Sequence, residues 1–144
     1  FIVATPDYPT LSCSLKIARL VKQKGKQING IIINKVRDPK YEIPLNEIEK
    51  TIGIPVVAQI PDDKNAIRAI FSKTPVSVYN PKSKFSKEIN KLNAALTNTQ
   101  EKRSFLRRLF SPKFKKEEIN RQLLKESFYI GFFNSREQNL LKLK

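Results

Sequence analysis

Three polar stretches in the first half of the chain contain the residues best suited to chemistry. They are Thr5-Pro6-Asp7, Asn34-Lys35 and Pro61-Asp62-Asp63, and each directly follows an apolar run. Open parallel sheets bind ligands beyond the carboxyl ends of their strands. An asparagine amide donates and accepts hydrogen bonds, as recognition of an adenine edge requires. Asn34 and the backbone of Pro61 and Asp62 are therefore candidates for binding a base. The alternative is that Asn34 only tolerates an awkward loop conformation and Pro61 only ends a strand.

Alternating strand and helix patterns would position these stretches. Apolar runs predict strands near 1–5, 30–34 and 55–60. Helical periodicity, with stop and cap signals, predicts helices at 10–25, 45–53, 62–73 and 84–96. A strand–helix alternation of this kind indicates βαβ units. We therefore expect an α/β fold with a parallel sheet in three layers over residues 1–96.

Composition excludes several classes of site. The chain has no histidine, so it cannot by itself form a serine–histidine triad or a histidine-ligated metal site. Its single cysteine, Cys13, excludes an internal disulfide and is expected to be a small buried residue. No apolar run approaches the length of a membrane-spanning helix. The net charge of +15 favours an anionic partner: nucleic acid, an acidic protein or an anionic membrane.

The segment 101–111 is a second candidate site. On a helix, Phe105, Leu106, Leu109 and Phe110 share one face of about 140°. Cationic side chains lie beside and opposite this face: Lys102, Arg103, Arg107 and Arg108. Packing on the domain and binding of nucleic acid are both alternatives. The apolar face adds nothing to phosphate binding, however, so the pattern favours an interfacial helix on an anionic membrane.

Residues 1–96 resemble the C-terminal half of MinD, in the MinD/ParA family of P-loop ATPases. The similarity rests on the order and spacing of the acidic turn at 5–7, "INK" at 33–35, "IGIPVVAQIPDD" at 52–63 and "TPVSVYNPKSKFSKEI" at 74–89. The resemblance implies a Rossmann-like P-loop NTPase fold. It also implies that Asn34, Pro61 and Asp62 recognise the adenine of ATP bound with Mg²⁺.

The phosphate-binding part of that family's site is not in this sequence. No G-x-x-x-x-G-K-[ST] pattern occurs, so the chain by itself should not hydrolyse ATP. The sequence begins within a predicted strand and contains no methionine. We therefore expect this chain to be the C-terminal part of a longer protein, whose upstream half carries the phosphate and metal ligands.

The resemblance also implies function and location. "KRSFLRRLFS" at 102–111 is similar to the family's membrane-targeting helix. We expect a reversible membrane-associated ATPase that selects the cell division site, forms an ATP-dependent homodimer and binds a division partner. It would be cytoplasmic, peripheral on the inner face of the cell membrane, with no specific nucleic acid partner. The alternatives are a ParA-like DNA-segregation ATPase and a non-catalytic adaptor with the same fold.

The C-terminal residues depart from the family. Residues 97–100 are a polar linker, and 112–144 form an extension with a helical pattern at 116–133. On that helix, Ile119, Leu123, Leu124 and Phe128 would share one side. The extension is a second interfacial segment, a partner-binding helix or a helix that docks on the domain. Docking is the interpretation that we favour.

Overall fold

The computed structural model describes residues 1–38, 40–97 and 116–124. A parallel sheet of three strands in the order β1-β2-β3 forms its centre. Along the chain the elements are β1 (Ile2–Ala4), α1 (Tyr8–Gln23), β2 (Ile31–Val36), α2 (Leu45–Ile52), β3 (Val56–Pro61), α3 (Lys64–Phe71), α4 (Val76–Tyr79) and α5 (Lys84–Leu96). Residues 116–124 form a further helix. The predicted α/β fold and the parallel pairing of the strands are confirmed.

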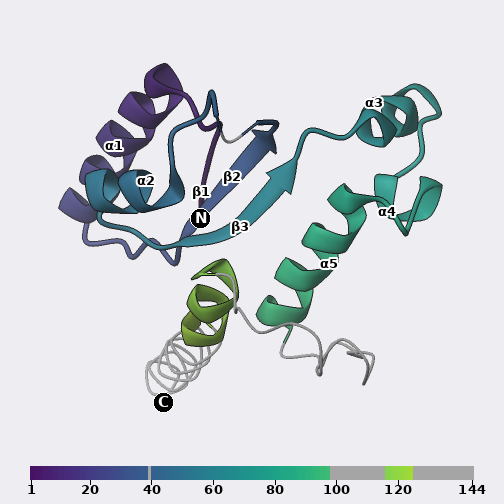
Figure 1. Cartoon of the computed structure of the whole chain (residues 1–144). Helices are drawn as coiled ribbons and strands as arrows, with labels where there is room; N and C mark the ends of the chain where they lie inside the picture. Colours follow the sequence, from purple (N-terminus) through teal and green to yellow (C-terminus); the bar gives the residue numbers. More distant parts are fainter. Residues whose placement is uncertain (39, 98–115, 125–144) are drawn as a thin grey trace, which may run out of the picture.

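Two apolar layers cover the sheet, one on each face. On the first face, Ile31 and Ile33 of β2 pack with buried residues of α1 and α2, such as Leu11 and Ile48. On the second face, Val57 and Ala58 of β3 pack with Leu92 of α5 and Leu124 of helix 116–124. Figure 1 shows α1 and α2 on one side of the sheet and α5 on the other. The expected three-layer arrangement is therefore present.

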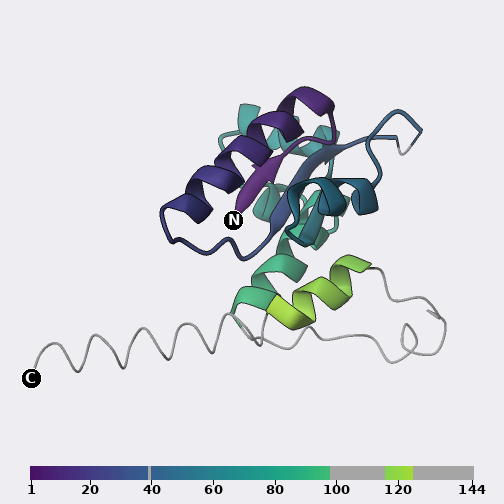
Figure 2. The same cartoon turned by 90° about the vertical axis from the view of Figure 1, so that its left-hand side faces the viewer.

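Helix 116–124 docks on the body through a face that includes Leu124 of the predicted side but not Ile119 or Leu123. Ile119 and Leu123 are exposed, whereas Glu117, Arg121 and Leu124 are buried. This face is chosen because the docking site contains the carboxylates of Glu49 and Glu88, which attract basic and amide side chains. Figure 2 shows this helix next to the C-terminal end of α5. Phe128 lies outside the described residues.

One other expectation needs correction, and one helix was not expected. Cys13 is exposed on α1, and its neighbour Ser14 is buried, donating a hydrogen bond to the Thr10 carbonyl at 2.9 Å. The helical face that contacts the sheet passes through Leu11, Ser14 and Ala18, which leaves position 13 outside. In addition, residues 76–79, which follow Pro75, form the short helix α4 that the sequence patterns did not predict.

Candidate functional site at the carboxyl ends of the strands

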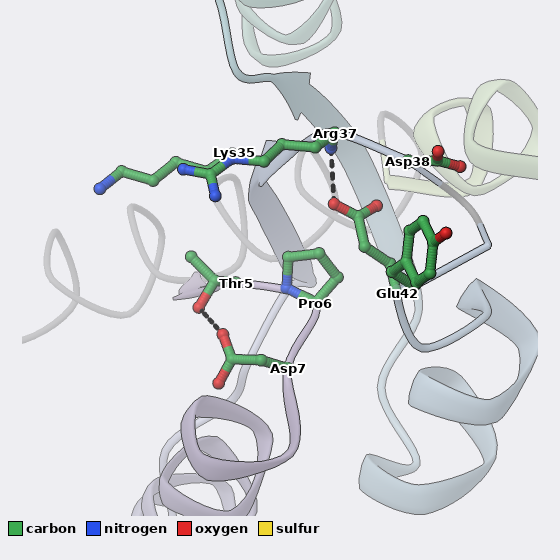
Figure 3. Close-up of a pocket in the computed structure, with 8 residues that line it drawn as sticks. Thr5, Pro6, Asp7, Lys35, Arg37, Asp38 and Glu42 are labelled. Carbon is green, nitrogen blue, oxygen red and sulfur yellow. Dashed lines mark hydrogen bonds between the residues drawn. The ribbon is translucent and has the colours of Figure 1, made fainter.

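The polar stretches after the three strands meet at one edge of the sheet. A cleft of about 470 Å³, a size within the range of small-molecule sites, opens beside the ends of β1 and β2; the predicted residues Asn34, Pro61 and Asp62 are not part of its lining. Its lining comes from the ends of β1 and β2 and the loop that follows β2: Thr5, Pro6, Asp7, Lys35, Arg37, Asp38, Tyr41 and Glu42. Figure 3 shows the Lys35 and Arg37 side chains extending in the same direction over this edge.

The end of β1 is fixed by Asp7, which caps the N-terminus of α1. Its carboxylate accepts hydrogen bonds from the Thr10 amide at 2.9 Å and from the hydroxyls of Thr5 and Thr10. Figure 3 shows the bond from Thr5. These bonds hold the pKa of Asp7 below its ordinary value. The bond from Thr5 has the largest effect, followed by that from the Thr10 amide. Asp7 is therefore ionised at neutral pH and places negative charge at the helix N-terminus, where the macrodipole favours it.

Asn34 lies in a bulge of β2. Ile33 pairs with Gln59 and Val36 with Pro61, so β2 has one more residue than β3 between these pairs. Lys35 takes up the difference with a left-handed backbone, φ 56°. The Asn34 side-chain oxygen accepts a hydrogen bond from the Lys35 amide at 2.9 Å. Bulges occur often next to functional sites, because they redirect side chains and leave backbone groups unpaired.

Pro61 and Asp62 continue directly from β3. Pro61 is the last residue of the strand, and the Asp62 amide donates to the Val36 carbonyl at 2.9 Å. The Asp62 carboxylate forms an ion pair with the Arg37 guanidinium, with Nε and Oδ2 2.6 Å apart. Because the Asp62 amide is occupied, this loop can offer a ligand carbonyl oxygens rather than that N–H.

The pair of Arg37 and Asp62 is the feature that sequence reasoning missed. The two residues are 25 positions apart, and no local pattern relates them. The backbone amide of Arg37 also donates a hydrogen bond to Glu42 at 2.5 Å, which holds the loop after β2 against the cleft (Figure 3).

Asp63, the last residue of the predicted stretch after β3, caps the N-terminus of α3. Its carboxylate accepts a hydrogen bond from the Asn65 amide at 2.9 Å.

The other predicted site residues lie outside the described residues. These are the membrane-segment positions Lys102, Arg103, Phe105, Leu106, Arg107, Arg108, Leu109 and Phe110. Within the part of the chain that the structure describes, no cluster of three metal-ligating side chains occurs. No described helix is long and apolar enough to cross a bilayer.

Sequence comparison finds ATP-binding relatives. No family model matches the chain. Two uncharacterized ATP-binding proteins of Methanocaldococcus jannaschii are 30% and 31% identical to it over 95 and 91 residues. These matches cover 66% and 63% of this chain, but 36% and 34% of the relatives. The chain thus spans about a third of the length of the curated relatives it matches.

Three solved structures are similar to this chain. One is a septum site-determining protein MinD of Pyrococcus horikoshii, complexed with Mg-ADP. The match covers 70% of this chain and 44% of that protein, with a TM-score of 0.59. The sequence identity is 22%, so this match supports the fold alone. The cell division ATPase MinD of Pyrococcus furiosus is 26% identical, with a TM-score of 0.50 over 62% of this chain and 40% of its own. A ParA family ATPase from Chlorobium tepidum is 35% identical over 61% of this chain and 37% of its own, with a TM-score of 0.54.

Proposed function

We propose that this chain, which is similar in sequence and fold to the C-terminal part of MinD in the MinD/ParA family of P-loop ATPases, forms the base-binding side of an ATP site. One observation carries the proposal. The bulge with Asn34 and the end of β3 are tied together by the Asp62–Val36 hydrogen bond and the Arg37–Asp62 ion pair, which gives the two segments a fixed relation.

The available hydrogen-bonding groups suit an adenine edge. Adenine offers a ring-nitrogen acceptor and an exocyclic amine donor side by side. The Asn34 side-chain nitrogen can donate to the ring nitrogen, since it is the side-chain oxygen that accepts from the Lys35 amide. Carbonyl oxygens of the Pro61–Asp62 loop can accept from the amine. The described residues do not fit Mg²⁺ in the same way, because they contain no cluster of ligands for it.

Replacing Asn34 tests this role. In the complete protein, Asn34→Ala should weaken ATP binding on the order of tenfold, because one or two hydrogen bonds to the base are lost. Isothermal calorimetry measures the affinity, and circular dichroism checks that the fold is kept. Asn90→Ala, at an exposed position of α5, is the matched control and should leave affinity unchanged. Equal affinities of the two variants would make Asn34 a loop residue only.

The proposed biological role is that of a membrane-associated ATPase in division-site selection. Its support is the sequence of 101–111, in which four large apolar side chains share a face among cations. A single helix of this length binds a bilayer weakly and reversibly. ATP-dependent homodimerisation would strengthen binding, because two linked helices act together. A division partner protein and a location on the inner face of the membrane belong to the same proposal.

Charge on the apolar face should abolish membrane binding. We expect Leu109→Glu with Phe110→Glu to prevent sedimentation with anionic vesicles, because two carboxylates would have to enter the acyl region. The control is Ile119→Glu with Leu123→Glu, which adds the same charge at exposed positions of helix 116–124. Salt should weaken wild-type binding without eliminating it, since the apolar contribution is not screened.

A ParA-like role in DNA segregation is the second candidate. The observation in its favour is the 35% identity to a ParA family ATPase. If vesicle binding is absent, and duplex DNA binds with a steep salt dependence, the DNA role replaces the membrane role.

A further inference from the structure

Helix α3 turns an apolar face toward solvent. Ile67, Ile70 and Phe71 are 54%, 74% and 84% exposed. At 100° per residue these three positions, with Lys64 and Arg68, occupy an arc of about 160°. The opposite side of the helix contains Ala69, the buried residue of α3. An ordinary surface helix would direct its large apolar residues inward, so this orientation needs an explanation.

The position of α3 leaves this face accessible. Figure 1 shows α3 and α4 set apart from the sheet, beyond the carboxyl end of β3. The sheet order makes β1 and β3 the outer strands, with α3 following β3. A strand added beside β1 would therefore join at the opposite edge of the sheet from β3.

The segment that contains this face, from the first residue of α3 to the first turn of α5, is cationic, although Asp62 and Asp63 precede it. Residues 64–87 contain six lysines and arginines and no aspartate or glutamate. All six are exposed: Lys64, Arg68, Lys73, Lys82, Lys84 and Lys87. Apolar side chains among cations at a projecting tip are the arrangement that anionic bilayers bind.

The backbone of Lys73, just after α3, is a second observation that favours a functional role for this part of the molecule. Lys73 follows α3 with a left-handed backbone, φ 51°. Its amide donates to the Ile70 carbonyl, and the Thr74 amide donates to the Ala69 carbonyl, both at 3.0 Å. The same pair of bonds ends α1, where the equivalent position is Gly25. A lysine there costs about 1 kcal/mol relative to glycine, and such strain points to a role for the side chain.

We infer that one surface of α3 contacts an anionic lipid bilayer. This surface, called the α3 surface below, consists of Lys64, Ile67, Arg68, Ile70, Phe71 and Lys73. Ile70 and Phe71 enter the interface, while the cations neutralise headgroups. The isoleucines add nothing to binding of nucleic acid phosphates, so the lipid is favoured over DNA. This inference rests on the proposed membrane-associated function, but the α3 surface contains none of the residues of 101–111. Stable attachment generally takes two signals, and this surface would be the second.

The first test removes the apolar contacts. In the complete protein, Ile70→Ser with Phe71→Ser should weaken binding to vesicles of phosphatidylglycerol and phosphatidylcholine by about tenfold or more. The matched control is Ile17→Ser with Leu20→Ser, which removes two side chains of α1 that are 48% and 55% exposed. The control should change binding by less than about twofold. Equal effects of the two pairs would overturn the inference.

The second test separates lipid contact from a structural role. Lys73→Gly should raise the midpoint of urea unfolding, because the strained residue is replaced by the one that the backbone prefers. The same variant should weaken vesicle binding about fivefold, the effect of one cation near an anionic surface. Lys22→Gln on α1 is the control for the loss of a single charge and should change vesicle binding little. A Lys73→Gly variant that is more stable and binds vesicles as the wild type does would exclude Lys73 from the contact.

A third comparison distinguishes this inference from the proposed membrane role. If Leu109→Glu with Phe110→Glu abolishes binding and the Ile70/Phe71 variant binds normally, the α3 surface is not a lipid contact, although the proposed role stands. If the Ile70/Phe71 variant loses binding and the Leu109/Phe110 variant keeps it, the inference stands and the role assigned to 101–111 fails. If only duplex DNA binding responds to Arg68→Gln with Lys73→Gln, the surface binds nucleic acid, and the inference is overturned.

Discussion

Gly30, directly before β2, is a glycine whose backbone lies close to neighbouring atoms. A Cβ atom there would lie 2.6 Å from Cγ1 of Val57 and 3.3 Å from the Pro55 carbonyl oxygen. Val57 is fully buried, and the register between β2 and β3 shifts beside it, so it has little room to move. We expect Gly30→Ala to lower the free energy of unfolding by about 1–3 kcal/mol, the range for overpacked cores. Chemical denaturation measures this.

A control at another glycine isolates the cause. Gly25 has open space around its Cα, but its φ of +66° disfavours a side chain. Gly25→Ala should therefore cost about 1 kcal/mol through backbone strain alone. If Gly30→Ala proved as stable as the wild type, the close approach to Val57 would have to relax without cost.

Helix 116–124 is an element whose docking depends on two carboxylates. Arg121 donates to Glu88 at 2.5 Å, and Lys116 forms an ion pair with Glu49. The Asn120 side chain donates to Glu49 at 2.7 Å and to the Val56 carbonyl at 2.8 Å. Burial raises the pKa of both glutamates, but these hydrogen bonds and charges lower it more. Both pKa values therefore lie below the ordinary 4.5.

The sign of these shifts predicts release of the helix in acid. A depressed folded-state pKa means that the stabilisation is present above pH 4.5 and is lost as pH falls through the lower folded values. The protection of the amides of 116–124 against hydrogen exchange, relative to their intrinsic exchange rates at the same pH, should therefore decrease below pH 4.5, before the sheet unfolds. Glu88→Gln should produce the same release at neutral pH, because it removes the charge that faces buried Arg121.

An exposed glutamate provides the comparison for this element. Glu47→Gln, two residues from Glu49 on α2, removes a carboxylate that faces solvent. It should leave exchange over 116–124 unchanged. If the helix stayed protected in Glu88→Gln, the contacts of Leu124, Asn120 and Lys116 would suffice for docking.

At the scale of the whole molecule, one face of the sheet is covered unevenly. Val3 pairs with Ile32 and shares its face, where α5 and helix 116–124 cover β3. Val57 and Ala58 are fully buried there, yet Val3 is 60% exposed on the outer strand β1. An apolar outer strand is a template for association. The isolated chain should therefore self-associate, as size-exclusion chromatography with light scattering would detect.

A charge on the outer strand should reduce that association. Val3→Lys places a cation on the exposed face of β1, the device by which natural proteins protect sheet edges. Tyr41→Lys, at an exposed loop position, adds the same charge elsewhere and should not have this effect. A monomeric wild-type chain with one cooperative unfolding transition would contradict the prediction.

The sequence by itself determined the three strands, their order and the main helices between them, but not α4. Continuous apolar runs such as 30–34, bounded by polar stretches, suit strands buried on both faces, and helices between them favour parallel pairing. It therefore also predicted that Asn34 and the Pro61–Asp62 loop lie at the same edge, because all parallel strands end on one side. Their role toward a base stays a prediction.

Only the tertiary structure decided which faces meet. The Arg37–Asp62 pair joins residues that are distant in sequence, and helix 116–124 docks through Arg121 because Glu88 is present on α5. Periodicity identifies an apolar face of α3 but not that it points to solvent, since this depends on where the helix is held. The same limit explains why Cys13 was expected inside and is found outside. Periodicity is a local property of the chain, whereas burial depends on contacts between distant segments.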